Sequence, residues 1–183
     1  IRASGRQIPV IYTSSIQAEA DNPYGASKKA AEQALIALER DTGSPVFIYR
    51  LPNVFGKWGR PNYNSAVATF CYNIANDLEI QINDPDAIIP LVYVDDVIAD
   101  FIKLLLVKSN GVLRPEITTE YTISVGDLAQ QIRSFKESRE SMVIGAVGAG
   151  LTRALYSTYL SFLKPEQFSY LLPIHEDHRG RFV

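Results

Sequence analysis

The apolar residues in the first part of this chain form two short runs with a helical stretch between them. Residues 8–12 and 45–50 are short, apolar and rich in β-branched side chains, which is typical of buried strands. Asp21-Asn22-Pro23 favours a helix start, because Asn and Asp cap helices and proline suits the first turn. Residues 26–38 are strong helix formers. Strand, helix and strand in this order predict a βαβ unit with parallel strands.

The second part of the chain predicts further short elements. We expect strands at 91–94 and 120–123, and helices at 64–77, 97–107, 124–138 and 156–163. Asn64 or Ser65 is the expected cap of the first of these helices, and Ser124 starts the third in a pattern like a capping box. Residues 51–63 carry prolines and glycines and predict a loop, which leaves the carboxyl end of a strand and should border a site. We interpret Asp95 and Asp96 as carboxylates that cap the helix after them.

Composition narrows the class of protein. At 183 residues the chain is long enough for a domain with a sizeable core, and 46% hydrophobic with 21% charged residues is ordinary for a globular protein. A net charge of −2 argues against binding nucleic acid or an anionic membrane. The single cysteine, Cys71, fits a buried small apolar residue in a reducing compartment, so we expect a cytoplasmic protein.

The side chains that could take part in catalysis lie around the end of the first predicted strand. Thr13, Ser14 and Ser15 follow this strand, and Tyr24 and Lys28 lie one turn apart on one face of the next helix. A nearby positive charge favours the phenolate form of a phenol, and a hydroxyl at the strand end can hold a carbonyl against it. This pattern favours the proton-transfer half of a carbonyl–alcohol redox site, with hydride supplied by a cofactor. The alternative is an exposed tyrosine, a solvated lysine and a polar strand end.

These motifs resemble the extended short-chain dehydrogenases/reductases, the NAD-dependent epimerase/dehydratase family. Within it, the chain is similar to the CapF-type reductases of capsule and O-antigen synthesis over about residues 8–100 and 156–183. The runs that carry this likeness are Ser14-Ser-Ile-Gln-Ala18, Asp21-Asn-Pro-Tyr-Gly25, Asn53-Val-Phe-Gly-Lys-Trp58 and Pro61-Asn-Tyr-Asn-Ser-Ala-Val-Ala-Thr-Phe-Cys71.

The resemblance implies roles for individual residues. Ser15 would hold the substrate carbonyl, Tyr24 would exchange the proton, and Lys28 would tune Tyr24 and bond the nicotinamide ribose. The cofactor, NADPH or NADH, would contact Ser14, Tyr24 and Lys28. Asn53 would contact the nucleotide sugar, although a turn asparagine is the alternative.

The loop after Asn53 offers further substrate-binding candidates: Lys57, Arg60, Tyr63 and Asn64. Many extended relatives carry an arginine just before the Val94-Asp-Asp96 segment to grip the diphosphate, and here residues 87–92 contain none. Lys57 and Arg60 are our candidates for that grip, since arginine suits bidentate phosphate contacts. The alternative is a solvated loop.

The resemblance also predicts the organisation of the chain. We expect the C-terminal half of a Rossmann-type α/β reductase domain with a small substrate-binding lobe, over residues 1–172. The N-terminal dinucleotide-binding half would be missing, and residues 173–183 would begin a C-terminal cupin domain that is otherwise absent. We therefore interpret the chain as an internal fragment, inactive alone, of a protein that forms a homo-oligomer.

Two other patterns invite interpretations that we do not favour. Residues 142–155 read as a strand, a glycine turn and a helix, but the spacing G-x-x-G-x-G differs from the dinucleotide-binding fingerprint. A glycine-alanine surface loop or a packed helix is the alternative. His175 and His178 are too few for a metal site, so we assign no metal.

The resemblance implies NADPH-dependent reduction of a UDP-linked 4-keto-6-deoxy-N-acetylhexosamine, on the route to UDP-N-acetylfucosamine. A nucleotide-sugar epimerase or 4,6-dehydratase uses the same Ser, Tyr and Lys. A dehydratase requires an Asp-Glu pair after the hydroxyl, where Ile16 and Gln17 stand. A non-catalytic reductase-like interaction module is the remaining alternative.

Overall fold

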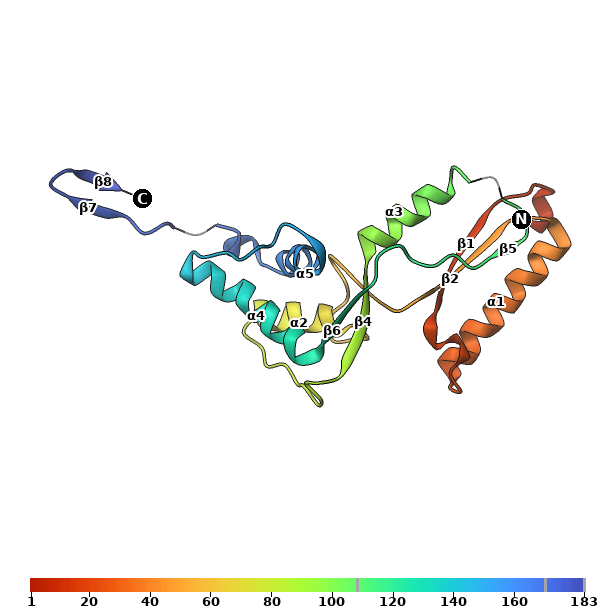
Figure 1. Ribbon diagram of the computed structural model, residues 1–183, viewed down its shortest axis with the longest axis horizontal. Helices are drawn as coiled ribbons and strands as arrows, with labels where there is room; N and C mark the ends of the chain where they lie inside the picture. The colour runs from red at the N-terminus through yellow and green to blue at the C-terminus, as the bar shows by residue number, and fades with distance from the viewer. Residues whose placement is uncertain (108, 170, 183) are drawn as a thin grey trace. The chain divides into compact units, whose positions relative to one another are not determined.

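The computed structural model contains both strands and helices over its described residues, 1–107, 109–169 and 171–182 (Figure 1). The strands are β1 (Val10–Ser15), β2 (Val46–Leu51), β3 (Asn53–Phe55), β4 (Ile88–Tyr93), β5 (Val112–Leu113), β6 (Tyr121–Ser124), β7 (His175–Asp177) and β8 (Gly180–Phe182). The α-helices are α1 (Pro23–Thr42), α2 (Ala66–Ala75), α3 (Val94–Leu104), α4 (Val125–Ser141) and α5 (Gly150–Leu160). Short 3₁₀ helices are η1 (Arg2–Ser4), η2 (Ile16–Glu19) and η3 (Pro165–Gln167). The predicted α/β class is confirmed.

The chain divides into two units. The first comprises Ile1–Val54 and Pro90–Thr122, and the second comprises Phe55–Ile89 and Ile123–Val183. The strand orders of the sheets are β1-β2-β5, β3-β4-β6 and β7-β8.

The first unit contains the predicted βαβ unit. Strand β1 pairs with β2 in parallel along its whole length, from Val10 opposite Val46 to Ser15 opposite Leu51. Strand β5 adds a short parallel pairing on the other side of β2. Helix α1 connects β1 to β2, so it starts near the carboxyl end of β1 and carries the Tyr24–Lys28 pair to that end of the sheet (Figure 1).

The two faces of this sheet have different partners, because successive strand residues point to opposite faces. Phe47, Tyr49 and Leu51 of β2 are buried in a core cluster with residues of α3, and the rings of Tyr49 and Phe101 lie 5.0 Å apart. Arg50 points to the opposite face, where it reaches α1. One face of β2 therefore packs against α3. The other carries the buried Val46 and Ile48 as well as Arg50, and it meets the helix that bears Tyr24.

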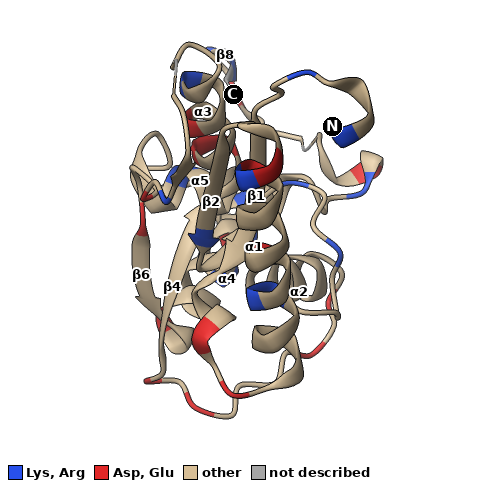
Figure 2. Cartoon of the chain, turned by 90° about the vertical axis from the view of Figure 1, so that its right-hand side faces the viewer, with Lys and Arg blue, Asp and Glu red and all other residues tan. Residues whose placement is uncertain are grey.

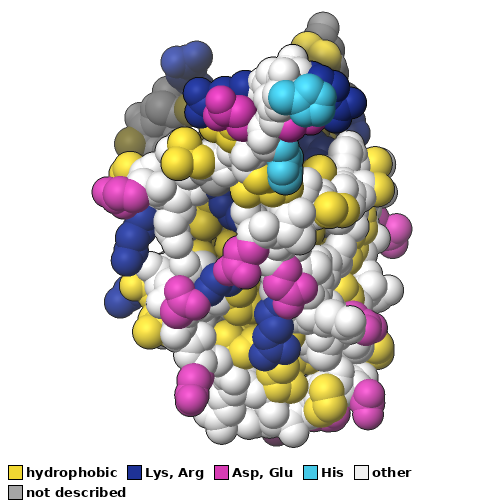
Figure 3. Space-filling model, turned by 90° about the vertical axis from the view of Figure 1, so that its left-hand side faces the viewer, with side chains coloured by type: hydrophobic (Ala, Val, Ile, Leu, Met, Phe, Trp, Pro, Cys, Tyr) yellow, Lys and Arg dark blue, Asp and Glu magenta, His cyan; other side chains and the backbone are white. Residues whose placement is uncertain are grey.

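The second unit has a helical core in which α2, α4 and α5 contribute buried apolar side chains. Phe135 of α4 meets Tyr156 and Tyr159 of α5 edge-on or tilted, at ring-centroid distances of 5.2 and 6.0 Å. Tyr72 of α2 lies 6.2 Å from Phe162. Figure 3 shows that many apolar side chains nevertheless remain exposed among polar ones on one face of the chain.

Several predicted boundaries were wrong. Strand β1 begins at Val10 and continues through Ser15, because Ser14 and Ser15 still pair with β2. The loop expected at 51–63 contains strand β3, and α3 starts at Val94. Asp95 and Asp96 therefore lie in the first turn of α3, where the helix dipole stabilises their negative charge. The cap position itself is occupied by Tyr93.

Other boundaries followed from capping as expected. Asn22, Ser65 and Ser124 are the N-caps of α1, α2 and α4, and each side chain accepts a hydrogen bond from the first turn. Among the described residues, no helix is both long and apolar enough to cross a membrane. Figure 2 shows positive and negative residues interspersed on the side of the chain that it presents.

Candidate active site

Tyr24 lies in the first turn of α1, at the carboxyl end of β1, with 49% of its surface exposed. Asn22 fixes this turn, because its Oδ1 accepts a 2.8 Å hydrogen bond from the Gly25 amide. Gly25 packs against the main chain of η2, the segment that follows Ser15: a Cβ atom there would lie 2.4 Å from the Gln17 carbonyl oxygen. The turn that bears Tyr24 is therefore held against the strand end that bears Ser15.

Lys28 lies one turn further along α1 and reaches back to β1. Its Nζ donates a 3.0 Å hydrogen bond to the Thr13 carbonyl oxygen. It also lies 5.7 Å from the centroid of the Tyr24 ring and 5.4 Å from that of Tyr12. The ammonium group therefore stands beside the Tyr24 phenol, as the four-residue spacing predicts, and a cation over an aromatic ring is attractive in itself.

Ser14 and Ser15 are both buried, with 5% and 8% of their surface exposed, but they have different partners. Ser15 ends β1, and its Oγ accepts a 3.1 Å hydrogen bond from the Gln17 amide, so it also caps η2. The Ser14 hydroxyl donates to the carboxylate of Glu32. Ser14 thus serves an internal contact in this structure, and its contact with a cofactor stays a prediction.

Glu32 is the buried centre of an ionic cluster on the face of the sheet that α1 covers. Only 2% of Glu32 is exposed. Arg50 of β2 donates from Nε to Oε1 at 2.9 Å and from Nη2 to Oε2 at 2.8 Å, a bidentate pair. Arg50 also bonds Glu19 at 2.8 Å, which in turn pairs with Lys29 at 2.8 Å.

The charged groups of this cluster stabilise one another's ionised forms. The hydrogen bonds from Arg50 hold the pKa of the Glu32 carboxyl below its usual range, against the effect of burial. The same hydrogen bonds raise the pKa of Arg50. Lys29 and Arg50 likewise lower the pKa of the exposed Glu19. Glu32 is therefore an ionised carboxylate in the folded protein at neutral pH.

The predicted substrate residues are divided between the two units. Asn53 belongs to the first unit, where it lies in β3 and its Nδ2 donates a 2.9 Å hydrogen bond to the Pro90 carbonyl oxygen. The Asn53 side chain is nevertheless exposed, so it stays accessible from the surface while it makes this contact. Lys57, Arg60, Tyr63 and Asn64 belong to the second unit.

The four residues of the second unit lie on a loop rich in aromatic and cationic groups. The Arg60 guanidinium lies over the Tyr63 ring at 5.0 Å, and the Lys57 ammonium lies 6.0 Å from the ring of Trp58. Tyr63 and Asn64 line a recess of about 500 Å³ whose other walls carry the amides of Asn62, Gln81 and Asn83. Amide groups offer both donors and acceptors, so this recess can hydrogen-bond a polar heterocycle or a sugar.

The patterns that we did not favour are not supported as sites. Residues 142–147, before the glycine turn, form no strand, and Gly145 and Gly148 have open space around them, as in a surface loop. His175 lies in the exposed hairpin of β7 and β8. Within the described part of the chain, no three His, Cys, Asp or Glu residues form a group able to hold a metal ion.

Two residues that shape this site, Gly25 and Glu32, were not predicted from the sequence. Gly25 lies between the Asn22-Pro23 helix start and the good helix formers at 26–38, and an isolated glycine within a helix is a signal of close packing. Glu32 continues the four-residue spacing of Tyr24 and Lys28, which places it on the same face of α1. That spacing could have identified Glu32, but not its burial or its partners.

The comparison with known families agrees with this geometry. Residues 4–118 match the description "NAD dependent epimerase/dehydratase family". This chain belongs to that family. The family and the Rossmann-type fold predicted from the sequence are therefore confirmed.

Individual relatives are closely similar. UDP-2-acetamido-2,6-beta-L-arabino-hexul-4-ose reductase of Pseudomonas aeruginosa is 58% identical over 183 residues, a match that covers 100% of this chain and 49% of that protein. The crystal structure of the capsular polysaccharide assembling protein CapF from Staphylococcus aureus superposes with a TM-score of 0.86 at 42% identity, covering 96% of this chain and 48% of CapF. The chain thus spans about half the length of these relatives.

A more distant structure shows the fold alone. UDP-glucose 4-epimerase of Thermus thermophilus, in complex with NAD, has a TM-score of 0.64 at 16% identity, covering 85% of this chain and 64% of the epimerase.

Proposed function

We propose that this chain forms the proton-transfer and substrate-side part of an enzyme that reduces a UDP-linked 4-keto-6-deoxy-N-acetylhexosamine with NADPH or NADH. The observation that carries the proposal is the Lys28 ammonium beside the exposed phenol of Tyr24, at the carboxyl end of two parallel strands. Ligands of open α/β sheets bind outside that end. The 58% identity to a protein named as a UDP-sugar reductase supports the substrate class.

The residues present fit the nicotinamide end of such a cofactor. Tyr24 is half exposed, and Lys28 brings a cation with further donors to the same edge of the sheet. These two residues would hold the nicotinamide ribose, and the bound cofactor would supply the hydride. The glycine run at 145–150 supplies no strand-to-helix turn for a pyrophosphate.

The chain's own residues would then handle the oxygen of the substrate. Tyr24 donates a proton to the carbonyl oxygen as it becomes an alcohol. Ser15 donates a hydrogen bond to the same oxygen and orients it. Lys28, a fixed cation, stabilises the phenolate that remains on Tyr24 by direct Coulomb attraction.

Each unit offers candidate residues for holding the substrate. Asn53 offers an amide to the sugar, and Lys57 and Arg60 offer positive charge to the diphosphate. Tyr63 and Asn64 line the amide-rich recess. We propose further that residues 1–172 are part of the reductase domain, that residues 173–183 begin a cupin domain, and that the full-length protein is a cytoplasmic homo-oligomer.

The test is the rate of Tyr24→Phe in the full-length protein with a UDP-4-keto-sugar and NADPH. We expect a loss of at least about a hundredfold in kcat, because the proton donor is removed. Tyr72→Phe is the matched control, which loses the hydroxyl of a tyrosine with no assigned role in the site, keeps the ring that packs on Phe162, and should keep kcat. An unchanged rate for Tyr24→Phe would favour the non-catalytic interaction module. Net consumption of NADPH separates reduction from epimerisation, because an epimerase returns the cofactor unchanged.

A further inference from the structure

A stripe along one face of α1 joins the proposed proton donor to Glu32, the buried centre of the ionic cluster. Tyr24, Lys28 and Glu32 follow one another at four-residue intervals, so they lie on neighbouring turns of one face. Exposure falls along the stripe, from 49% for Tyr24 to 2% for Glu32. The stripe therefore has an exposed end at the site and a buried end within the fold.

Glu32, at the buried end of the stripe, contacts the two adjacent strands β1 and β2 at the same position along the sheet. Ser14 of β1 and Arg50 of β2 are direct register partners. Both bond the Glu32 carboxylate, Ser14 through its hydroxyl and Arg50 through two guanidinium nitrogens. A single carboxylate of the helix thus bridges two adjacent strands, which fixes the helix along the strand direction.

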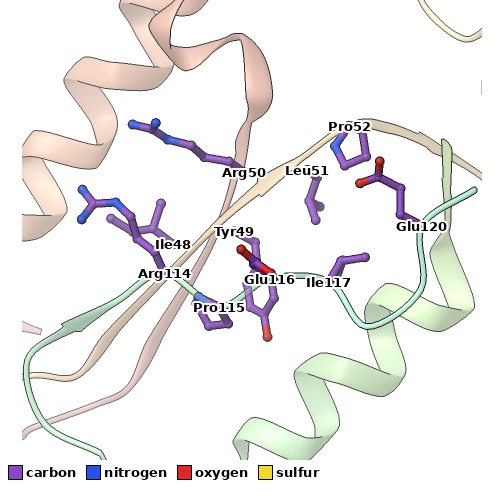
Figure 4. A pocket seen from close by; sticks show the side chains of 10 residues that line it. All are labelled: Ile48, Tyr49, Arg50, Leu51, Pro52, Arg114, Pro115, Glu116, Ile117 and Glu120. Carbon is purple, nitrogen blue, oxygen red and sulfur yellow. The ribbon is translucent and has the colours of Figure 1, made fainter. Parts of the chain in front are cut away.

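A second guanidinium faces the same carboxylate. Arg114, in the segment after β5, has its Nη2 3.9 Å from Glu32 Oε2. Arg50 and Arg114 both line a recess of about 400 Å³, and Figure 4 shows their side chains extending to the same side of the strand, away from Glu120. All three segments of the parallel sheet, β1, β2 and the chain after β5, therefore converge on Glu32.

We infer that Glu32 is a positioning residue that sets where α1 holds Tyr24 and Lys28 against the end of β1. The Glu32–Ser14 contact adjoins the Lys28–Thr13 contact, because Thr13 and Ser14 are consecutive. A shift of α1 along the sheet would break both contacts and carry Tyr24 away from Ser15. Displacements of about 1 Å can cost a hundredfold in rate. This inference rests on the proposed function.

Buried ion pairs contribute little to net stability when compared with apolar replacements, but they require a specific geometry. The Glu32–Arg50 pair is bidentate, and Glu32 Oε1 accepts a further hydrogen bond from Ser14. Such an arrangement is suited to fixing the position of α1 on the sheet.

The experiment compares Glu32→Gln with Asp41→Asn in the full-length protein. Asp41 lies on the same helix, and its loss removes an exposed 2.7 Å ion pair with Arg2, far from the stripe's exposed end. Amide hydrogen exchange is followed over residues 21–28, the turn that bears Tyr24, and over 46–51 of β2 as a reference. Steady-state kinetics give kcat and KM.

For Glu32→Gln we expect exchange at 21–28 to rise at least about tenfold while 46–51 stays protected, since local opening is read separately from global unfolding. We expect kcat to fall by about tenfold to a hundredfold with KM nearly unchanged. Asp41→Asn should change neither. Glu32→Asp keeps the charge on a shorter side chain and should recover part of kcat, and it serves if Glu32→Gln does not fold.

Equal acceleration of exchange at 21–28 and 46–51 would show a merely structural role and overturn the inference. Unchanged kcat would overturn it too. The exchange measurement needs no turnover, so it decides the position of α1 even if Tyr24→Phe proves the proposed function wrong.

Discussion

Gly25 lies so close to Gln17 that a Cβ atom on it would come within 2.4 Å of the Gln17 carbonyl oxygen. The Ala20 carbonyl oxygen would be 2.5 Å away. Both atoms belong to the main chain, so neither can rotate out of the way. The absence of a side chain at Gly25 is what lets the first turn of α1 rest on η2, between Ser15 and Tyr24.

Gly25→Ala should therefore both destabilise the protein and lower its activity. We expect a loss of about 1–3 kcal/mol in the free energy of unfolding, the range for overpacked sites, measured by urea denaturation. Gly145→Ala is the matched control, because nothing lies within 4 Å of a Cβ there, and it should change stability by less than about 0.5 kcal/mol. Equal stability of the two variants would contradict the close packing at Gly25.

Ser15→Ala should separate two roles of one hydroxyl. Its loss removes a cap of η2, at a cost of about 1 kcal/mol in stability, and the proposed hydrogen bond to the substrate oxygen, at a cost of about a hundredfold in kcat. Ser15→Thr keeps the hydroxyl and should retain most of both. If Ser15→Ala lost stability alone, Ser15 would be a capping residue only. Chemical denaturation and steady-state kinetics measure the two effects.

Arg60→Ala should weaken substrate binding with little effect on the chemical step. The guanidinium lies over Tyr63 and is exposed, so its removal leaves the fold intact. We expect KM for the UDP-sugar to rise about tenfold, the effect of one charge-assisted phosphate contact. Arg2→Ala, which removes an exposed arginine in the first unit, is the control. A KM unchanged by Arg60→Ala would indicate a solvated loop.

Stability should fall in acid through two buried carboxylates. Arg50 lowers the pKa of Glu32. Burial raises the pKa of Asp100, but hydrogen bonds from Lys103 and Thr118 outweigh it and lower that pKa overall. Since both folded-state pKa values lie below the unfolded values of about 4, the stabilisation is present above about pH 4 and is lost as the pH falls through the folded values.

The measurement is the free energy of unfolding in urea between about pH 7 and pH 3. Glu32→Gln should have a shallower decline than the unsubstituted protein, because one of the two groups is gone. A decline of the same steepness would assign the acid sensitivity to other carboxylates.

Cys71 should be inert in the folded protein. It is fully buried in α2, and burial raises the pKa of its thiol, so almost no thiolate is present or accessible. A thiol reagent at mild alkaline pH should label the native protein only as fast as the second unit opens, and should label one equivalent at once in urea. Rapid labelling without denaturant would show that α2 is not closed over Cys71.

Local patterns in the sequence determined much of the first unit. The apolar runs, the Asn22-Pro23 helix start and the spacing of Tyr24 and Lys28 predict the β1-α1-β2 unit and the pairing of phenol and ammonium, because periodicity and capping depend on near neighbours. The same holds for the caps at Ser65 and Ser124.

Only the tertiary structure decided what lies behind that pair. The register that sets Ser14 beside Arg50, the burial of Glu32 between them, and the contact of Gly25 with Gln17 join residues that are distant in sequence or belong to different elements. A pattern of near neighbours carries no information on such contacts. Strand β3 and the early start of α3 escaped prediction for the same reason: strand pairing and packing across the fold outweighed local turn signals.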